Sequence, residues 1–289
     1  MKILSLTVHE SEICAIDQCL NNMIVGGVDR IVLHVNRTGR FDVALFELLR
    51  DQLDALRGRV FVNPLSLPIA TMRDSPVHSQ AVHLAHLQNW FFARNLFDAS
   101  WFMLDASNTL LLRQGLAASL DGALRLNFAE MGAWHWRPRY ERDAAIDNKF
   151  RRVSAHEGAC FRADVFERLV PILLRYEALA ARQGFDYVEQ YPREEALFTN
   201  AALEAGVEPE GTTYIHMPWE RQLNWDLATA RETLASDSLA PGKFGIKRVA
   251  RDIDDPIRVL VGSHFGYRRQ LQDAVAALAD AHAPGGSAG

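Results

Sequence analysis

The sequence has 289 residues, of which 31 are Lys or Arg and 36 are Asp or Glu, so its formal net charge at pH 7 is −5. Its 48% hydrophobic and 23% charged residues match the composition of an ordinary globular protein. The negative charge argues against general affinity for nucleic acid or for anionic membranes, since both need a basic face.

Compartment and termini are constrained by what the sequence lacks. The three cysteines, Cys14, Cys19 and Cys160, form neither a disulfide framework nor a metal-type CxxC pair. The N-terminus has no signal-peptide pattern, and no apolar run reaches the roughly 18 residues of a membrane span. We therefore expect a cytoplasmic protein without a transmembrane segment, and a disordered tail over residues 283–289, whose small polar residues can bury little.

The predicted elements alternate along the chain. Apolar and β-branched runs predict strands over residues 2–9, 30–36, 59–64 and 99–107. Apolar residues at helical spacing predict helices over 10–27, 41–58, 79–97, part of 159–184, and 194–206, with a loop and a helix over 109–124. Strands that alternate with helices build parallel sheets, so the fold class is α/β, with a mostly parallel sheet and helices on both faces, in a single domain over residues 1–282.

Polar residues follow the predicted strands, where such sheets bind ligands. They include His9, Asn36, Asn63, Asp105 and Asn108. Loops are polar in any case, which is the alternative explanation. The strand that ends in Asp105 lacks the second carboxylate of an Asp-x-Asp metal site, because Ser107 stands there, so Asp105 is either a ligand-site residue or a loop or N-cap hydrogen-bond acceptor.

A basic stretch lies near the C-terminus of this acidic chain, at Lys243, Lys247, Arg248, Arg251 and Arg258. Fixed cations can neutralise a diphosphate leaving group without a metal, and arginine adds a bidentate fork. Lys247, Arg248 and Arg251 are therefore candidates for a diphosphate clamp. The alternative is a solvated charged face balanced by the aspartates at positions 252, 254 and 255.

Carboxylates supply the acid or base candidates. Glu194 and Glu195 open a helix after Pro192, where they either stabilise the helix dipole or, for one of them, deprotonate an attacking hydroxyl. Glu157 precedes a glycine that would let backbone approach a ligand closely, and is otherwise a turn carboxylate.

Other candidates are less specific. The loop residues Trp134, Trp136 and Arg139 suit sugar rings and hydroxyls, although tryptophan is also ordinary core. His83 and His86 lie three apart on a helix without a clear third ligand, which favours core or capping histidines over a metal site. Glycine-rich phosphate loops and a nucleophile elbow are absent from the sequence.

Taken in order, several segments resemble the core-2/I-branching β-1,6-N-acetylglucosaminyltransferase family and its bacterial relatives. "ILSLTVHE" and "IVLHVNR" resemble its first strands, and "HLAHLQNWFF" resembles its helix before an "LSGQD"-type loop, itself matched by "FMLDASNTLLLRQG". "HEGACFRADVFERLV" is similar to a "GSAYFVLSREFV"-type segment, "PREEALFTN" to a "PDEYLWAT"-type segment, and "FGIKRV" to a basic diphosphate-binding tail. The similarity covers residues 1 to about 260, and order and spacing carry it.

The resemblance implies a GT-A-like fold, a nucleotide-sugar donor (usually a UDP-sugar), inversion at the anomeric carbon and no metal or other cofactor. It implies that Glu195 is the base, that Lys247 and Arg248 bind the diphosphate, and that Glu157 lies near the acceptor. Two departures matter: Asn36 replaces an aspartate that would bear on the nucleotide base, and the loop at residues 105–108 lacks the family's glycine, which bears on the donor sugar.

The hypothesis from sequence is thus an inverting, metal-independent glycosyltransferase, a hexosyl- or N-acetylhexosaminyltransferase. Its partners would be a nucleotide-sugar donor and a glycan or glycolipid acceptor, in bacterial surface-polysaccharide synthesis, with peripheral membrane association compatible and the oligomeric state open. His9, Asn36, Asp105, Asn108 and Arg251 would complete the donor site, while Trp134, Trp136, Arg139 and Glu194 would face the acceptor. The alternatives are a non-catalytic nucleotide- or glycan-binding protein, a metal-dependent transferase that uses Asp105, and, ranked last, a phosphate-ester hydrolase.

Overall fold

A computed structural model describes residues 1–8, 11–36, 41–66, 82–120, 122, 124–125, 129–130, 152–153, 156–182, 193–208, 211, 213–216 and 225–282. His9, Trp134, Trp136, Arg139 and the tail at 283–289 lie outside these residues. Glu194 and Glu195 lie within a described helix, but their side chains are not described.

Among the residues that the structure describes, the main sheet has six strands in the order β3-β2-β1-β4-β9-β6. These are β3 (Val60–Val62), β2 (Arg30–Val35), β1 (Lys2–Val8), β4 (Trp101–Ala106), β9 (Cys160–Arg162) and β6 (Leu124–Arg125). The first four run parallel, whereas β9 is antiparallel to β4 and β6 is antiparallel to β9. The predicted α/β class with a mostly parallel sheet is therefore confirmed, and all four predicted parallel strands are present.

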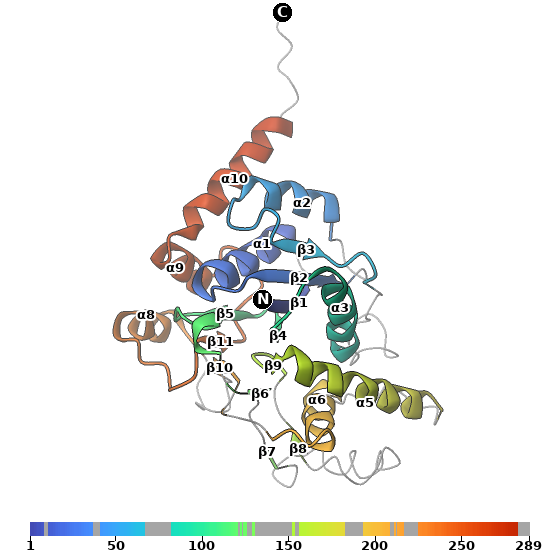
Figure 1. Ribbon diagram of the computed structural model, residues 1–289. Helices are drawn as coiled ribbons and strands as arrows, with labels where there is room; N and C mark the ends of the chain where they lie inside the picture. The colour runs from blue at the N-terminus through green and yellow to red at the C-terminus, as the bar shows by residue number, and fades with distance from the viewer. Residues whose placement is uncertain are drawn as a thin grey trace, which may run out of the picture.

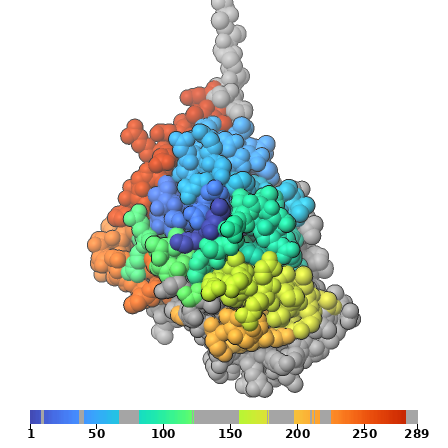
Figure 2. Space-filling model, viewed as in Figure 1, coloured from blue at the N-terminus to red at the C-terminus, as the bar shows by residue number. Residues whose placement is uncertain are grey.

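Helices cover both faces of the sheet, as predicted (Figure 1). On one face lie α1 (Glu12–Leu20), α2 (Val43–Gln52) and α10 (Tyr267–His282), and on the other lie α3 (Val82–Leu96), α5 (Ala163–Arg182) and α6 (Arg193–Glu204). Because successive residues of a strand point to opposite faces, β1 sends Leu4 and Leu6 into the first core and Ile3 into the second. In the space-filling view the surfaces of α3, α5 and α6 adjoin one another (Figure 2).

A second, three-stranded sheet lies beside the main one, in the order β10 (Ile215–His216), β11 (Gly245–Lys247) and β5 (Thr109–Leu111). Helices α8 (Leu227–Ser236) and α9 (Pro256–His264) pack against it. The prediction of a loop and a helix over 109–124 is wrong here. Leu110 and Leu112 enter the core beneath α8 and α9 while Leu111 enters the core of α1, the two-residue alternation of a strand, and a 3₁₀ turn over Ala117–Ser119 follows.

Other elements differ from the predictions at their ends. Helix α2 stops at Gln52 instead of continuing to Gly58, because Leu53 adopts extended backbone angles. Helix α1 continues as a π-helical turn, η1 (Asn21–Val25). A short ladder of β7 (Ala129–Glu130) and β8 (Arg152–Val153) was not predicted. The three cysteines are buried and none of them forms a disulfide. Within the described ranges no helix has both the length and the apolar character that crossing a bilayer requires.

Candidate functional site

Charged side chains from both sheets meet at the carboxyl end of β4. Asp105 is the penultimate residue of β4, and Thr109 opens β5 after a two-residue turn. Lys247, the last residue of β11, lies opposite Thr109 in the antiparallel ladder between β11 and β5. Glu157 comes from the chain before β9, which is held to β4 by the hydrogen bond from the Gly158 amide to the Leu104 carbonyl, 2.8 Å. The second sheet thus delivers a cation to the edge at which the main sheet delivers carboxylates.

Asp105 is fully buried, and its side chain is engaged by both Thr109 and Tyr214. Its Oδ1 accepts hydrogen bonds from the Ala106 amide, 2.9 Å, and from Thr109 Oγ1, 2.7 Å, and the hydroxyl of the buried Tyr214 interacts with the same carboxyl group. Burial raises the pKa of Asp105 to about 7, although these hydrogen bonds oppose the rise. The loop hydrogen-bond role considered for Asp105 is therefore present, and near neutral pH this carboxyl group can carry or release a proton.

Glu157 and Lys247 form an ion pair at the edge of this buried region. Lys247 Nζ donates to Glu157 Oε1, and the two side chains are 15% and 7% exposed, respectively. Burial opposes the charge of Glu157, but the neighbouring His156 and Lys247 lower the pKa of Glu157 to about 2. Burial also lowers the pKa of His156 to about 4, so at pH 7 this histidine is neutral and Lys247 balances the glutamate. Glu157 Oε2 has no described hydrogen-bond partner.

Two buried histidines link Glu157 to the helices on the second face. The His156 and His86 rings lie 5.5 Å apart between centroids, and His86 Nδ1 shares a 2.8 Å hydrogen bond with Ser5 Oγ of β1. Burial lowers the pKa of His86 well below its ordinary value, so it is also neutral. The sequence favoured core or capping histidines at positions 83 and 86 of α3, and the structure places both in the core, fully buried. His156 was not predicted as a site residue, although it directly precedes Glu157, which was.

Helix α6 approaches the same region through Phe198, whose ring centroid lies 6.2 Å from that of His86. The helix begins at Arg193, directly after Pro192, so the predicted start is confirmed within one residue. Residue 195 stands three positions before Phe198, and residues three apart share a face of a helix. The backbone thus brings the position of Glu195 to the side of α6 that approaches the His86–His156 pair.

Two exposed arginines follow Lys247 directly in the chain. Arg248 is exposed and has a φ of 67°, in the left-handed region that non-glycine residues rarely adopt. Arg251 is exposed as well. The unusual backbone at Arg248 turns the chain out of β11, and the next amide, that of Val249, bonds back to the Asn108 carbonyl, 3.1 Å. The three candidate clamp residues are therefore one partly buried cation and two surface cations.

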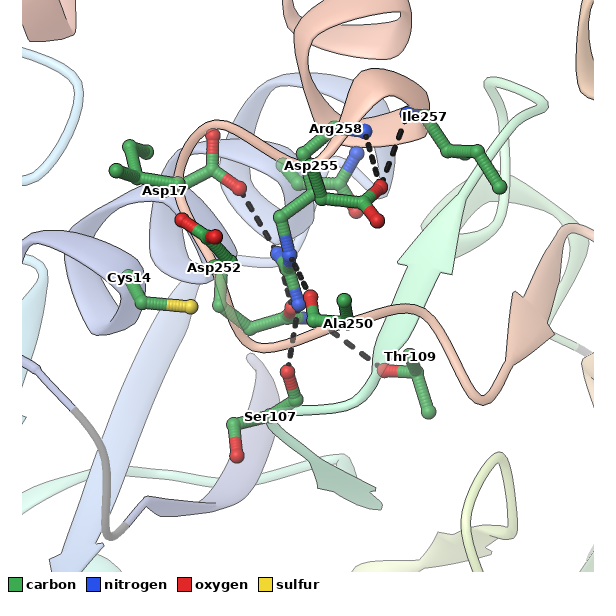
Figure 3. A network of polar contacts seen from close by, with 12 residues as sticks. Cys14, Asp17, Ser107, Thr109, Ala250, Asp252, Asp255, Ile257 and Arg258 are labelled. Atoms are coloured by element: carbon green, nitrogen blue, oxygen red, sulfur yellow. Dashed lines mark hydrogen bonds and ion pairs between the residues drawn. The ribbon is translucent and has the colours of Figure 1, made fainter. Parts of the chain in front are cut away.

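The remaining residues of the basic stretch have structural partners. Lys243 is buried, and its Nζ donates to the Ile215 carbonyl, 3.0 Å. Arg258 is fully buried and pairs with Asp17 at 2.8 Å (Figure 3). Burial raises the pKa of Asp17 against the opposing effect of the Arg258 charge.

The three aspartates near these arginines, at positions 252, 254 and 255, make other contacts. Asp255 caps α9 by accepting from the Ile257 and Arg258 amides, and Asp254 pairs with Arg268 at 3.0 Å. Asp252 Oδ1 accepts from the Asp254 amide, 3.0 Å. Asp254 and Asp255 are thus engaged by Arg268 and by the N-terminus of α9, respectively.

The other predicted donor-site residues occupy loop ends. Asn36 is buried at the end of β2, with its amide 2.9 Å from the Val8 carbonyl, and Asn108 lies in the turn between β4 and β5. Their positions agree with polar residues at the carboxyl edge of the sheet. No three histidine, cysteine or carboxylate side chains within the described ranges are grouped so as to hold a metal ion.

Comparisons with known proteins give structural likeness alone. No family model and no curated protein matches the sequence. Among solved structures, a galactosyltransferase, LgtC, in complex with donor and acceptor sugar analogs has a TM-score of 0.48 at 12% identity, covering 92% of this chain and 95% of that one. An active-site mutant of LgtC gives 0.47 at 13% identity with the same coverage, and apo mouse xyloside xylosyltransferase 1 gives 0.44 at 10%, covering 85% and 97%. Likeness at this level assigns neither a family nor an activity to the chain.

Proposed function

We propose that the chain is an inverting, metal-independent glycosyltransferase with a GT-A-like domain over residues 1–282. Its donor would be a nucleotide-sugar, with a UDP-sugar as the first candidate. The observation that carries the proposal is that Lys247 pairs with Glu157 and stands opposite Thr109, whose hydroxyl donates to Asp105 at the carboxyl end of β4. In α/β sheets this edge binds ligands, and the sequence resemblance places a donor diphosphate beside the same lysine.

The charges around Lys247 support a role for this lysine in holding a diphosphate. Lys247 is already balanced by Glu157, so this pair adds little net charge to the site. Its ammonium group has three donors, and the bond to Glu157 uses one of them. Arg248 and Arg251, one and four residues further along the chain, are exposed and would add further positive charge. We infer that the arginines attract the diphosphate and that Lys247 contributes a directed hydrogen bond from the inside.

In the proposed reaction Glu195 accepts the proton of an acceptor hydroxyl. The hydroxyl oxygen forms a bond to the anomeric carbon of the donor while the bond from that carbon to the diphosphate oxygen breaks, and the electron pair leaves with the diphosphate. Attack on the face opposite the leaving group inverts the anomeric carbon. Fixed cations then neutralise the charge that develops on the diphosphate. The position of Glu195 on α6, one turn before Phe198, supports its assignment as the base.

The donor and acceptor ends of the site remain proposals from the sequence. His9 and Asn36 would contact the nucleotide, Asp105 and Asn108 the donor sugar, and Arg139 with two tryptophans, Trp134 and Trp136, the acceptor glycan. Glu157 and Glu194 would lie on the acceptor side. We place the reaction in bacterial surface-polysaccharide synthesis on the cytoplasmic side of the membrane.

The decisive experiment is a thermal-shift panel of nucleotides and nucleotide-sugars, each with and without chelator, followed by transfer assays with the donor that binds. The expected results are stabilisation by one nucleotide-sugar class that is indifferent to chelator, and transfer that falls about 10²–10⁴-fold in Glu195→Gln with donor binding retained. Saturable binding without transfer would identify a binding protein instead. A strict Mn²⁺ requirement would favour the Asp105 metal hypothesis.

A further inference from the structure

Arg258 makes four hydrogen bonds from a fully buried position between α9, α1 and the second sheet (Figure 3). Its Nη1 donates to Asp17 Oδ2, 2.8 Å, and to Gln18 Oε1, 3.2 Å, both on α1. Its Nη2 donates to the Ser107 carbonyl, 2.7 Å, and its Nε to the Ala250 carbonyl, 2.7 Å. One guanidinium group therefore joins a helix and two loops that are far apart in the sequence.

The two loops are those that carry the candidate donor site. Ser107 belongs to the turn between Asp105 and β5, and Ala250 lies two residues after Arg248. The two loops also touch directly, through the bond from the Val249 amide to the Asn108 carbonyl. Because the buried Arg258 side chain bonds to both loops, the distance between Asp105 and the arginines depends on it.

A second path leads from the same network to Asp105. Gln18, which accepts from Arg258, donates through its Nε2 to Thr109 Oγ1, 3.2 Å. Thr109 Oγ1 in turn donates to Asp105 Oδ1, 2.7 Å. The buried network thus reaches the carboxyl group at the end of β4 as well as the loop that follows it.

The choice of a charged residue here calls for a reason other than stability. Removing two charges from water costs so much that a buried ion pair is often no more stable than well-packed apolar side chains of the same volume. What an apolar pair cannot supply is donors to two backbone carbonyls, and lysine lacks the planar fork that reaches several acceptors at once. The arrangement fits a requirement for fixed geometry.

We propose that Arg258 is a positioning residue that fixes the Asp105–Asn108 turn relative to the basic segment at 247–251, and thereby sets the affinity for the donor diphosphate. The inference rests on the proposed function for its ligand, but not for its geometry. In this role Arg258 contacts neither the substrate nor the reacting atoms. It acts only through the two loops that it holds.

The test uses variants that separate position from stability. Arg258→Met leaves Asp17 buried without its partner, so the variant can fail to fold. The double variant Asp17→Asn/Arg258→Met removes that charge and should recover stability, yet still lacks the donors to Ser107 and Ala250. Val261→Ala, in the same helix and packed in the core beneath α8, is the matched control, because it loosens α9 without touching the network.

Binding of UDP and of the donor found in the panel is the first readout. We expect the dissociation constant for UDP and the KM for the donor to rise at least about 10-fold in the double variant, with kcat changed less than about 3-fold, and both constants to stay near wild type in Val261→Ala. Arg258→Lys should lie between them. Wild-type affinity in a folded double variant would overturn the inference.

Hydrogen exchange at the Val249 amide is the second readout and needs no ligand. Exchange should be at least about 10-fold faster in the double variant than in Val261→Ala, because the bond to Asn108 loses its support. If wild-type protein binds no nucleotide or nucleotide-sugar, the proposed function is wrong, and the exchange rate alone decides whether Arg258 fixes the two loops. An unchanged rate in the double variant would refute that as well.

Discussion

Lys247 and Arg258 belong to the same basic stretch, but the ion pairs that they form differ in how deeply they are buried. Arg258 and Asp17 are both fully buried, and the guanidinium group donates to four acceptors. Lys247 and Glu157 are 15% and 7% exposed, and Glu157 keeps one oxygen without a described hydrogen-bond partner. The closed pair fits a structural role, whereas the open pair keeps polar groups that a ligand could still engage.

The comparison also explains why an acidic chain gathers these cations. They do not form one patch: two are buried against carbonyl groups or a carboxylate, one is paired at the edge of the site, and two are exposed beside it. A count of basic residues in the sequence would overstate the charge that a ligand meets. Arg248 and Arg251 are the two cations of this stretch that lie exposed at the surface.

Breaking the open pair from the lysine side should have the largest effect. Lys247→Met would leave Glu157 buried without a cation, and loss of one partner of a buried pair costs about 3–5 kcal/mol of unfolding free energy. Urea unfolding at pH 7 measures this. In the double variant Lys247→Met/Glu157→Gln the loss should shrink to less than half, because no charge is left unpaired. A loss below about 1 kcal/mol in the single variant would mean that water already solvates Glu157.

The neighbouring Asp105 makes the stability of the protein depend on pH. A carboxyl group whose pKa is about 7 in the fold and 3.8 otherwise retains its proton in the folded state between these values, so its contribution to stability falls as pH rises from about 4 to 7 and is constant above. This difference corresponds to at most about 4 kcal/mol. Asp105→Asn should therefore gain stability relative to wild type as pH rises through this range.

The measurement is the difference in unfolding free energy between the Asn variant and wild type at pH 5 and at pH 8. Using the difference matters because the buried neutral histidines His86 and His156 act in the opposite sense: their lowered pKa values make stability fall as pH drops below 6.5. They are common to both proteins and cancel. Glu157, whose pKa is lowered to about 2, loses its contribution only as pH falls below about 4.5. If the difference in unfolding free energy did not change between pH 5 and pH 8, Asp105 would not retain its proton in the folded state over this range.

Much of the fold could be predicted from the sequence because its strands are long apolar runs bounded by polar loops. The strands at Lys2–Val8, Arg30–Val35 and Trp101–Ala106 fall within their predicted ranges. The strand at Thr109–Leu111 was missed because a run of four apolar or β-branched residues fits a strand or the start of a helix equally well. Its identity depends on β11, more than 130 residues later.

The candidate site shows the same limit more sharply. Glu157, Lys247 and Asp105 could each be named from local pattern and resemblance, but their meeting could not, because Lys247 lies 90 residues beyond Glu157. The partner of Arg258 was not predicted at all: Asp17 is 241 residues away and stands on a helix whose spacing of apolar residues gave no hint of a buried acid. The sequence identifies candidate groups, and the topology decides which of them are neutralised.

The smallest expected effect concerns the backbone of Arg248. Replacing this residue tests whether the exposed part of the basic stretch binds a ligand. A left-handed conformation costs a non-glycine residue about 1–2 kcal/mol, while glycine costs about 0.5–1 kcal/mol more backbone entropy on folding. Arg248→Gly should therefore leave the unfolding free energy unchanged or raise it by up to about 1 kcal/mol. A hydrogen bond from a charged group contributes about 1.5–3 kcal/mol, so UDP affinity should fall about 10- to 100-fold in the same variant.

Two further variants separate strain from charge. Arg248→Lys keeps the charge and the left-handed backbone, and should keep most of the affinity with no gain in stability. Arg251→Gly removes an exposed cation from a position without positive φ, and should lose affinity with a small loss of stability. If Arg248→Gly instead lost more than about 1 kcal/mol, the strained backbone would be stabilised by contacts of the arginine itself, and Arg248 would belong with Arg258 among the structural cations.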